Sequence, residues 1–368
     1  MDYYLLPVSE NYEAIGELWK RLQFENDHSY FISWEVISYW LRHVDKNVPL
    51  FCVVFEDHGK PEACAILTYR TNWKHRFIPS RTISLNSSGL AKYDRLFWIE
   101  YNGILGQNCT KETIEALLNI FPHGCDEVLF PGMDFSSDLT QTLKTQQFTG
   151  FAFTEDNVQT AYYVDLAKVR ENNNDLLPLI KSNTRSQIRR SYRIYREQGS
   201  VIFECADTTK YALDIFSELF DLHKMAFKQR NRVSHFSTSQ AYDFHRKFIQ
   251  ERFDFGEIQM IRVSTKKGTI GCLYNFVYQG RVYFFQNGMN YQKDNRLKPG
   301  LICHVEAIQH NAIQGNDFYD FLAGNERFKA SLSNGNNASM IWGRLQRRSL
   351  PFVLERWIYN KLNRYRKK

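Results

Sequence analysis

The segment from Asn295 to Lys329 combines residues that could bind an anion with residues that could move a proton. Pro299 and Gly300 precede an apolar-periodic stretch and therefore predict the start of a helix. Backbone N–H groups and the positive dipole end at such a start attract phosphate, and a glycine allows close approach. We expect a phosphate-bearing carrier to be bound here by Arg296, Lys298, Pro299, Gly300 and Leu301.

Two acidic side chains follow this helix in a predicted strand at residues 318–322 and the loop after it. Transfer of a group from such a carrier needs a side chain that deprotonates the acceptor, and Asp320 and Glu326 are the candidates. Strand alternation sets Asp320 on the face opposite Tyr319, where a buried carboxylate would need a partner. Either acid could equally be a solvated carboxylate. His304, one turn into the helix, is a candidate base or a core histidine.

Amide and cationic side chains are the candidate acceptor-binding groups. Gln286 and Asn287 end an aromatic-rich predicted strand, where they could bind an acceptor or cap the next turn. Asn325 lies in the loop beside Glu326. A cationic stripe with helical spacing comprises Lys181, Arg185, Arg189, Arg193 and Arg196. Such a stripe favours an anionic partner (a nucleotide-sugar diphosphate, a lipid diphosphate, a carrier protein or nucleic acid), and a solvated face is the alternative.

The order of these motifs resembles the GNAT-like acyltransferases described as CelD-like, relatives of the Fem-type aminoacyltransferases of peptidoglycan synthesis. The resemblance covers about residues 183–329 and rests on R185-x-x-x-R-R-S191, F244-H245, Y283-F-F-Q-x-G288, K298-P-G300 and D320-F-L-x-G-N-E-x-F-K329. It implies transfer from acyl-CoA, or another thioester or ester carrier, to an amine or hydroxyl. It also implies Lys329 as the group that stabilises the oxyanion, and it matches Arg185 and Arg189 to recurrent arginines. A GNAT pyrophosphate loop usually has two glycines, whereas only Gly300 is present here.

Length and composition indicate a globular protein of two domains. The chain has 368 residues, of which 43% are hydrophobic and 15% aromatic. No basic region followed by an apolar core opens the sequence, and no run of 18 apolar residues occurs, so we expect neither a signal peptide nor a membrane-spanning helix. The seven cysteines are scattered without a CxxC pair. This pattern favours reduced thiols in a cytoplasmic protein, and we expect no metal.

The net charge of +7 is concentrated in two segments. Residues 344–368 contain nine basic residues and one acid, and residues 181–196 contain six basic residues and no acid. The C-terminal segment also carries an apolar stripe that includes Leu354 and Trp357. A helix there would either pack on the first domain or lie on an anionic membrane surface, as a peripheral contact at the inner face.

Both halves of the chain follow one predicted plan: two helices, an antiparallel hairpin, a further strand, a helix and a short strand. The hairpins span residues 50–69 and 258–278. This order predicts an α/β (α+β) protein of tandem GNAT-like domains, each a mixed, mostly antiparallel sheet flanked by helices. We expect a degenerate N-terminal domain at 1–165 and a catalytic domain with a basic C-terminal helix at 166–368. Residues 107–111, the first-half counterpart of the Gly300 region, lack a glycine.

The combined features predict an N- or O-acyltransferase of GNAT type. The expected donor is acyl-CoA, with acetyl-CoA the leading candidate. The expected acceptor is an amine or hydroxyl of an anionic small molecule or glycan precursor related to envelope polysaccharides. Direct transfer in a ternary complex is expected, because no cysteine or serine stands in a nucleophile motif. Acyl carrier protein and tRNA stay open as partners. Fem-like aminoacyl transfer from tRNA, and non-catalytic binding of nucleic acid or membrane, are the alternatives.

Overall fold

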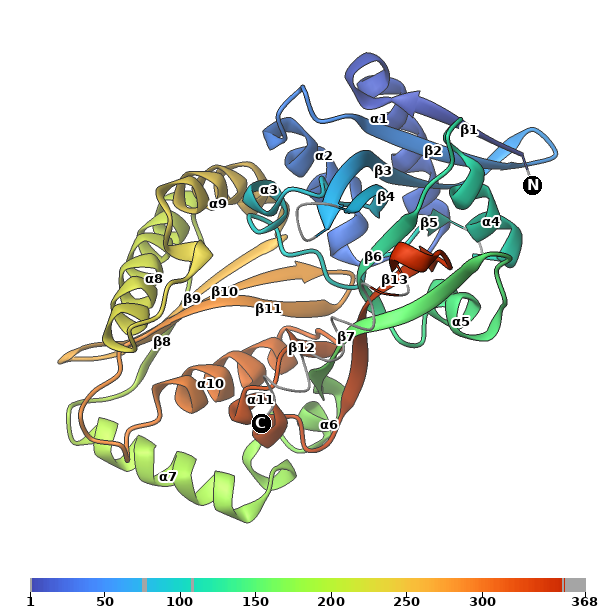
Figure 1. Ribbon diagram of the computed structural model, residues 1–368. Helices are drawn as coiled ribbons and strands as arrows, with labels where there is room; N and C mark the ends of the chain where they lie inside the picture. Colours follow the sequence, from blue (N-terminus) through green and yellow to red (C-terminus); the bar gives the residue numbers. More distant parts are fainter. Residues whose placement is uncertain (1, 75–77, 107–108, 353, 355–368) are drawn as a thin grey trace. The chain divides into compact units, whose positions relative to one another are not determined.

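The computed structural model describes residues 2–74, 78–106, 109–352 and 354. The chain forms two compact units (Figure 1). Unit 1 comprises residues 1–158 and 339–368, and unit 2 comprises residues 159–338. No helix among the described residues is both long and apolar enough to cross a membrane.

Unit 1 is built on a mixed sheet with the strand order β1-β2-β3-β4-β6-β13. These strands are β1 (Asp2–Pro7), β2 (Leu50–Asp57), β3 (Lys60–Lys74), β4 (Ile78–Leu85), β6 (Glu127–Asp134) and β13 (Asn337–Arg347); the short β5 (Leu105–Gly106) also pairs with β3. Neighbours are antiparallel except β4 and β6, which are parallel over three residue pairs. A parallel pair needs a crossover, and α4 lies within it.

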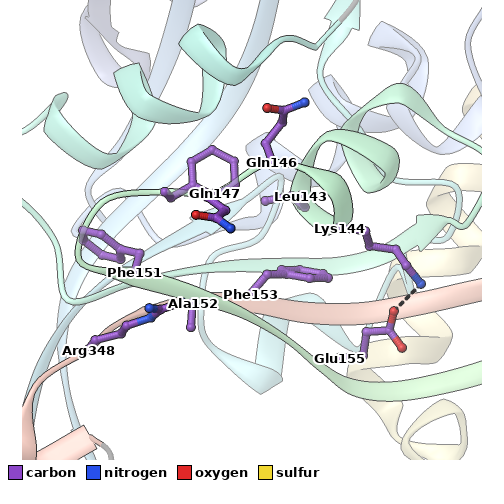
Figure 2. A pocket seen from close by; sticks show the side chains of 10 residues that line it. Leu143, Lys144, Gln146, Gln147, Phe151, Ala152, Phe153, Glu155 and Arg348 are labelled. Atoms are coloured by element: carbon purple, nitrogen blue, oxygen red, sulfur yellow. Dashed lines mark hydrogen bonds and ion pairs between the residues drawn. The ribbon is translucent and has the colours of Figure 1, made fainter.

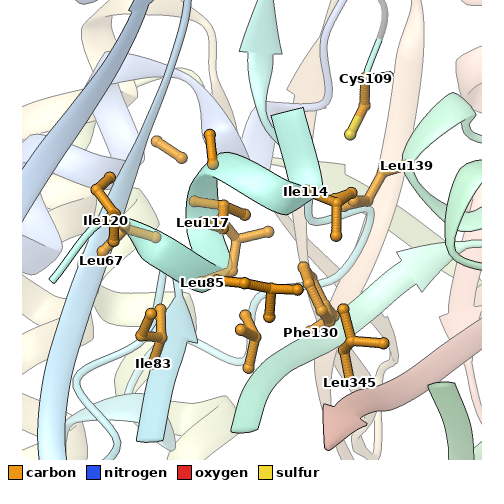
Figure 3. Close-up of a cluster of buried hydrophobic side chains, with 14 of the residues drawn as sticks. Leu67, Ile83, Leu85, Cys109, Ile114, Leu117, Ile120, Phe130, Leu139 and Leu345 are labelled. Carbon is orange, nitrogen blue, oxygen red and sulfur yellow. The ribbon is translucent and has the colours of Figure 1, made fainter. Parts of the chain in front are cut away.

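Helices cover both faces of the unit 1 sheet. The helices are α1 (Val8–Glu25), η1 (Tyr30–Ile32), α2 (Trp34–His43), α3 (Ala91–Asp94), α4 (Lys111–Asn119) and α5 (Asp138–Thr145). Side chains alternate along β4, so Ile83 and Leu85 face α4 and pack with Leu117, as Figure 3 shows. Leu345 of β13 joins the same core. A separate core, centred on Trp19 and Trp40, lies under α1 and α2.

Unit 2 repeats this plan with the strand order β8-β9-β10-β11-β12-β7. Its strands are β7 (Phe151–Asp165), β8 (Ile202–Cys205), β9 (Ile258–Thr265), β10 (Gly268–Tyr278), β11 (Arg281–Met289) and β12 (Phe318–Ala323). Here too neighbours are antiparallel except at one step, where β11 and β12 run parallel. The crossover between these two strands contains α10 (Pro299–Ile313).

The helices of unit 2 lie on the two faces of its sheet (Figure 1). They are α6 (Leu166–Glu171), η2 (Leu177–Leu179), α7 (Ser182–Arg196), α8 (Thr209–Gln229), η3 (His235–Ser237), α9 (Ser239–Arg252), η4 (Phe253–Phe255), α10 and α11 (Arg327–Leu332). The α7 and α10 helices bury one face in a core that includes Ile188, Ile302 and Tyr319. The α8 and α9 helices cover the other face with an aromatic cluster around Phe216 and Tyr274.

The observed domain boundaries differ from the expected division into residues 1–165 and 166–368. The last strand of each sheet comes from the segment that follows the other sheet's final helix. The β7 strand follows α5 but pairs with β12, and β13 follows α11 but pairs with β6. Residues 339–347 therefore belong to unit 1, because strand pairing decides unit membership and sequence proximity does not. The expected basic C-terminal helix falls largely on residues 355–368, outside the described residues, and stays a prediction.

The strand exchange makes a prediction about Leu345, which is fully buried in unit 1 although it follows unit 2 in sequence. Leu345→Ala should lower the free energy of unfolding by about 2–5 kcal/mol in denaturant titrations, because it leaves a cavity in the core. Hydrogen exchange should accelerate mainly in residues 2–158. The matched variant Leu332→Ala, buried in unit 2, should accelerate exchange mainly in residues 159–338. Exchange patterns that do not differ between the two variants would contradict the unit assignment.

Candidate functional site

The parallel ladder between β11 and β12 is short. It joins residues 281–283 to residues 318–320 and stops at Tyr283 and Asp320. The β11 strand then continues to Met289 paired with β10, and β12 continues to Ala323 beside β7. Among the described residues no further pair joins β11 to β12, so the strands separate at their carboxyl ends. In open α/β sheets, ligands bind at the carboxyl ends of parallel strands.

The start of α10 lies at this same end of the sheet, since a crossover helix runs antiparallel to the strands it joins. Lys298 is the N-cap residue, and no side chain caps the helix. A Cβ added at Gly300 would meet no atom within 4 Å. The side-chain position at Gly300 is therefore open, and no side chain caps the first N–H groups of α10 in competition with an anion. This start has Pro299 at its first position, as predicted.

The corresponding helix in unit 1 begins differently. Thr110 caps α4: its side chain accepts the backbone N–H of Thr113, and the Thr113 side chain bonds back to Thr110. Glu112 adds a negative charge in the first turn. A side chain and an acid thus take the place of an external anion. The expectation that the first domain is degenerate stays a prediction.

The two cations predicted at the carrier site, Arg296 and Lys298, differ in exposure and in their protein partners. Arg296 donates hydrogen bonds to both carboxylate oxygens of Asp294 at 2.8–3.1 Å, and these bonds lower the pKa of Asp294 to about 2. Arg296 could reach a phosphate only by exchanging this partner, which is easy for an exposed pair. Lys298 is half-buried, and its backbone N–H donates to Ser191 Oγ of α7 at 3.0 Å.

The α7 helix carries the predicted cationic stripe and is held against α10. Besides Ser191, the hydroxyl of Tyr192 donates to Glu306 Oε1 at 2.6 Å, and burial beside this carboxylate raises the pKa of Tyr192. Arg189, Arg193 and Arg196 are exposed, as is Lys181 at the N-cap, while Arg185 is half-buried. No ion pair involves any of these cations within the part of the chain that is described. The stripe is therefore a cationic surface next to the start of α10.

Asp320 is fully buried, with both carboxylate oxygens engaged. Oδ2 lies 2.8 Å from Arg281 Nη1, and Oδ1 accepts the backbone N–H of Leu322 at 2.8 Å. Leu322 has a φ of 59°, a strained value for a branched residue, and the register of β12 shifts here. Asp320 thus shapes the end of β12, and these contacts disfavour it as a base. Sequence reasoning missed Arg281, because only the parallel register reveals its partner.

Glu326 and Lys329 lie together, as predicted, beside the end of β12. Lys329 is buried, and its Nζ donates to the carbonyl of Ala323 at 2.7 Å and lies 3.1 Å from Glu326 Oε2. The Glu326 side chain is 58% exposed and can move. A Cβ at Gly324, with a φ of 141°, would lie 2.3 Å from the Glu326 carboxylate. A glycine is needed there, and Asn325 beside it is exposed.

His304 is a buried residue of the site's supporting core. Its Nδ1 lies 3.0 Å from the Tyr319 hydroxyl, its ring stacks on Phe328 of α11, and Phe284 of β11 meets it edge-on. Burial, with a smaller effect of Lys329, lowers its pKa to about 3. His304 is therefore neutral, and it connects α10, β11, β12 and α11. These contacts favour the core interpretation over a role as base.

Gln286 and Asn287 lie near the end of β11, where the strand passes close to α8. The Gln286 side chain accepts the backbone N–H of Asn287 at 3.0 Å, which is the turn-capping alternative. His223 of α8 donates through Nδ1 to the Asn287 carbonyl at 2.9 Å and bonds Ser234 Oγ through Nε2. Sequence reasoning missed His223, since a histidine on an apolar helix face carries no signal of its partner. Both amides stay half-buried.

Metal-binding groups and a further hollow in unit 1 bear on where other chemistry could occur. No group of three or more histidine, cysteine or acidic side chains that could hold a metal occurs among them. Unit 1 contains a hollow of about 450 Å³ whose wall includes Lys144 and Glu155, an ion pair at 2.6 Å. Figure 2 shows this pair and Phe153 beside it. None of the predicted site residues lines this hollow.

Residues 182–330 match the family model described as acetyltransferase (GNAT) domain. Among solved structures the chain is similar to FemX, at 11% identity with a TM-score of 0.58 over 96% of this chain and 100% of that one. It is also similar to a conserved protein of unknown function from Bacteroides thetaiotaomicron, at 10% identity with a TM-score of 0.53 over 90% of this chain and 97% of that one. A third similar structure is the C-terminal domain of a putative lysylphosphatidylglycerol synthetase from Agrobacterium fabrum, at 12% identity with a TM-score of 0.51 over 91% of this chain and 92% of that one. The curated proteins gave no match. The predicted tandem GNAT-like fold is confirmed.

The buried state of His304 predicts a pH dependence of stability. Folding lowers the pKa of His304 from 6.5 to about 3, so the unfolded chain takes up a proton there more readily than the folded protein. The contribution of neutral His304 to the free energy of unfolding is therefore fully present above pH 6.5 and is lost as the pH falls toward 3. The free energy of unfolding should lose up to about 1.4 kcal/mol per pH unit in that window through this residue. Denaturant titrations of His304→Phe should show a shallower acid slope. His123→Phe, at an exposed histidine, should keep the wild-type slope. Equal slopes in all three proteins would contradict the assignment.

Proposed function

Because residues 182–330 match a GNAT acetyltransferase domain, we propose that unit 2 transfers an acyl group from acyl-CoA to an amine or hydroxyl. Acetyl-CoA is the donor that we propose first. The observation that carries the proposal is the uncapped start of α10 at the carboxyl ends of two parallel strands whose ladder stops after three pairs. That combination offers a phosphate site and, beside it, an opening in the sheet.

The donor would bind at the start of α10. The N–H groups of Gly300 and Leu301 have no side-chain cap to compete with a pyrophosphate. Lys298 and Arg296 supply positive charge, the latter after it exchanges Asp294 for phosphate. Cations of α7 lie close by through the Ser191 contact, and they suit the remaining phosphate of coenzyme A.

The thioester would then lie between β11 and β12. Beyond Tyr283 the backbone groups that face the opening are not paired to β12, so an N–H there can donate to the thioester carbonyl as charge develops. The acceptor attacks the carbonyl carbon, the C–S bond breaks, and coenzyme A leaves as a thiolate that takes up a proton. We propose Glu326 as the base that takes the acceptor's proton, because it is the exposed acid at this end of β12.

Lys329 would act through its charge and not through a free donor. Its ammonium group already donates to the Ala323 carbonyl and pairs with Glu326. When Glu326 turns toward an acceptor, the Lys329 ammonium group loses this ion pair, and its positive charge can stabilise a developing oxyanion. Asp320, through Arg281, would keep the end of β12 in position. His304 would do so through its aromatic contacts.

The cationic surface of α7 supports an anionic acceptor, such as a glycan precursor related to envelope polysaccharides. Acyl carrier protein is a second proposed partner of this surface, and a peripheral membrane contact is proposed for the basic segment at residues 344–368. One alternative has a specific observation in its favour: transfer from aminoacyl-tRNA, as the similarity to Fem-type enzymes implies. Its support is that α7 presents five arginines without one acidic residue, which suits a polyphosphate backbone.

A binding experiment at Gly300 tests the donor site. Isothermal titration with coenzyme A should give saturable binding that weakens at least tenfold, by about 1.4 kcal/mol, in Gly300→Trp. Gly300→Ala should bind like the wild type, because a Cβ there meets open space. A crude tRNA sample titrated in parallel should bind weakly. Strongly salt-dependent tRNA binding without coenzyme A binding would favour the alternative.

Glu326→Gln tests the chemistry. It should lower kcat by about 10²–10⁴ with coenzyme A affinity unchanged, because the variant keeps the size of the side chain and loses its basicity. Thiol release from acetyl-CoA with a panel of amine and hydroxyl acceptors provides the measurement. Asp243→Asn, at an exposed acid on α9, is the matched control and should keep full activity. Unaltered turnover in Glu326→Gln would remove this residue from the mechanism.

A further inference from the structure

Unit 1 contains a cavity of about 320 Å³ with mainly aromatic and aliphatic walls. It lies where the parallel ladder between β4 and β6 ends, since Ser84 and Leu129 are the last pair of that ladder and both line the cavity. Trp40 of α2 and Trp342 of β13 form further parts of the wall. The cavity therefore occupies the position in unit 1 that corresponds to the opening between β11 and β12 in unit 2.

The aromatic content of this cavity is high for its size. Three of the chain's seven tryptophans line it, together with Phe97. Trp40 and Phe97 are 1% exposed and belong to the core, whereas Trp98 is 48% exposed. A half-exposed indole beside a cavity leaves apolar surface in water that a ligand could cover.

The polar side chains at the cavity are already engaged with the protein. The Asn86 side chain donates to two protein oxygens and accepts the backbone N–H of Ile66 at 2.8 Å. The Asp94 carboxylate accepts hydrogen bonds from Ser87 Oγ and from the N–H and Oγ of Ser88 at 2.7–2.8 Å. Recognition of a hydroxyl-rich ligand would need free donors and acceptors, and these two groups offer little capacity for it.

Charge at the cavity also disfavours a phosphorylated ligand. Asp94 and Arg95 both line it and supply one charge of each sign. The start of α4, the counterpart of the proposed anion site in unit 2, is capped by the Thr110 side chain and carries Glu112 in its first turn, and both disfavour an anion there. The walls of the cavity therefore favour an uncharged, apolar ligand. At about 30 Å³ per water-sized group, the volume holds on the order of ten non-hydrogen atoms.

We propose that this cavity binds the hydrophobic portion of a small uncharged ligand, such as an aliphatic chain of about ten carbon atoms. Unit 1 is then a ligand-binding module with its own specificity. This inference does not rest on the transfer reaction of unit 2, and binding measured without acyl-CoA can support it even if that reaction is disproved.

Isothermal titration of the full chain with 1-hexanol, 1-octanol and 1-decanol provides the test. Affinity should rise by about fourfold per CH₂ group, the increment for burial of a methylene, and should level off once the chain fills the cavity. Trp98→Ala, which removes an exposed wall, should weaken octanol binding at least fivefold. N-acetylglucosamine, a hydroxyl-rich ligand of similar size, should give no saturable binding.

Trp73→Ala is the matched control, because Trp73 is 64% exposed in unit 1 and does not line the cavity. It should bind octanol like the wild type. Equal octanol affinity in the wild type and Trp98→Ala would overturn the proposal, as would affinity independent of chain length. A side chain of a second copy of the protein could also fill the cavity. Sedimentation that shows a dimer, dissociated by Trp98→Ala, would overturn the proposal in favour of that occupant.

Discussion

A parallel pair of strands joined by a helix imposes the geometry on which the candidate site depends. The crossover between β11 and β12 brings the start of α10 to the carboxyl ends of both strands. The ladder ends there after three pairs, since Asp320 Oδ1 takes the backbone N–H of Leu322 and the register of β12 shifts. An anion site and an opening in the sheet are therefore consequences of one connection, and every polar residue of the site is positioned relative to it.

Two buried residues maintain this geometry. Asp320 is costly to bury as a charge, and the Arg281 guanidinium at 2.8 Å offsets that cost. His304 avoids the cost by remaining neutral, with its Nδ1 bonded to Tyr319 and its ring against Phe328. Both were candidates for proton transfer on residue type alone. Their engagement with protein partners leaves Glu326 as the acid of this site whose carboxylate is exposed.

The two units show how one plan can hold different sites. Both sheets have the same sequence of antiparallel and parallel steps, with a helix in the crossover. The differences are local: Thr110 caps α4, whereas no side chain caps α10, and tryptophans line the unit 1 cavity. A capped helix start engages one of its own N–H groups and so competes with an anion for that position. Ligand class can thus change between repeats without a change of fold.

Much of this fold was predictable from local patterns, because hydrophobic periodicity and turn residues act over a few positions. The helix start at Pro299, the hairpin around Gly268, the repeat of the two halves and the loop that carries Glu326 and Lys329 all follow from such patterns. Residue type also limited the chemistry to acids, amides and cations near one helix start.

Contacts between distant positions were decided only by the tertiary structure. Arg281 meets Asp320 across a parallel register, His223 meets the Asn287 carbonyl across a helix–strand contact, and β13 joins the sheet of unit 1. Each depends on which strands pair, a choice made by the summed burial of both faces and not by any single segment. For the same reason the sequence by itself determined the candidate groups, whereas the fold decided which of them are free to react.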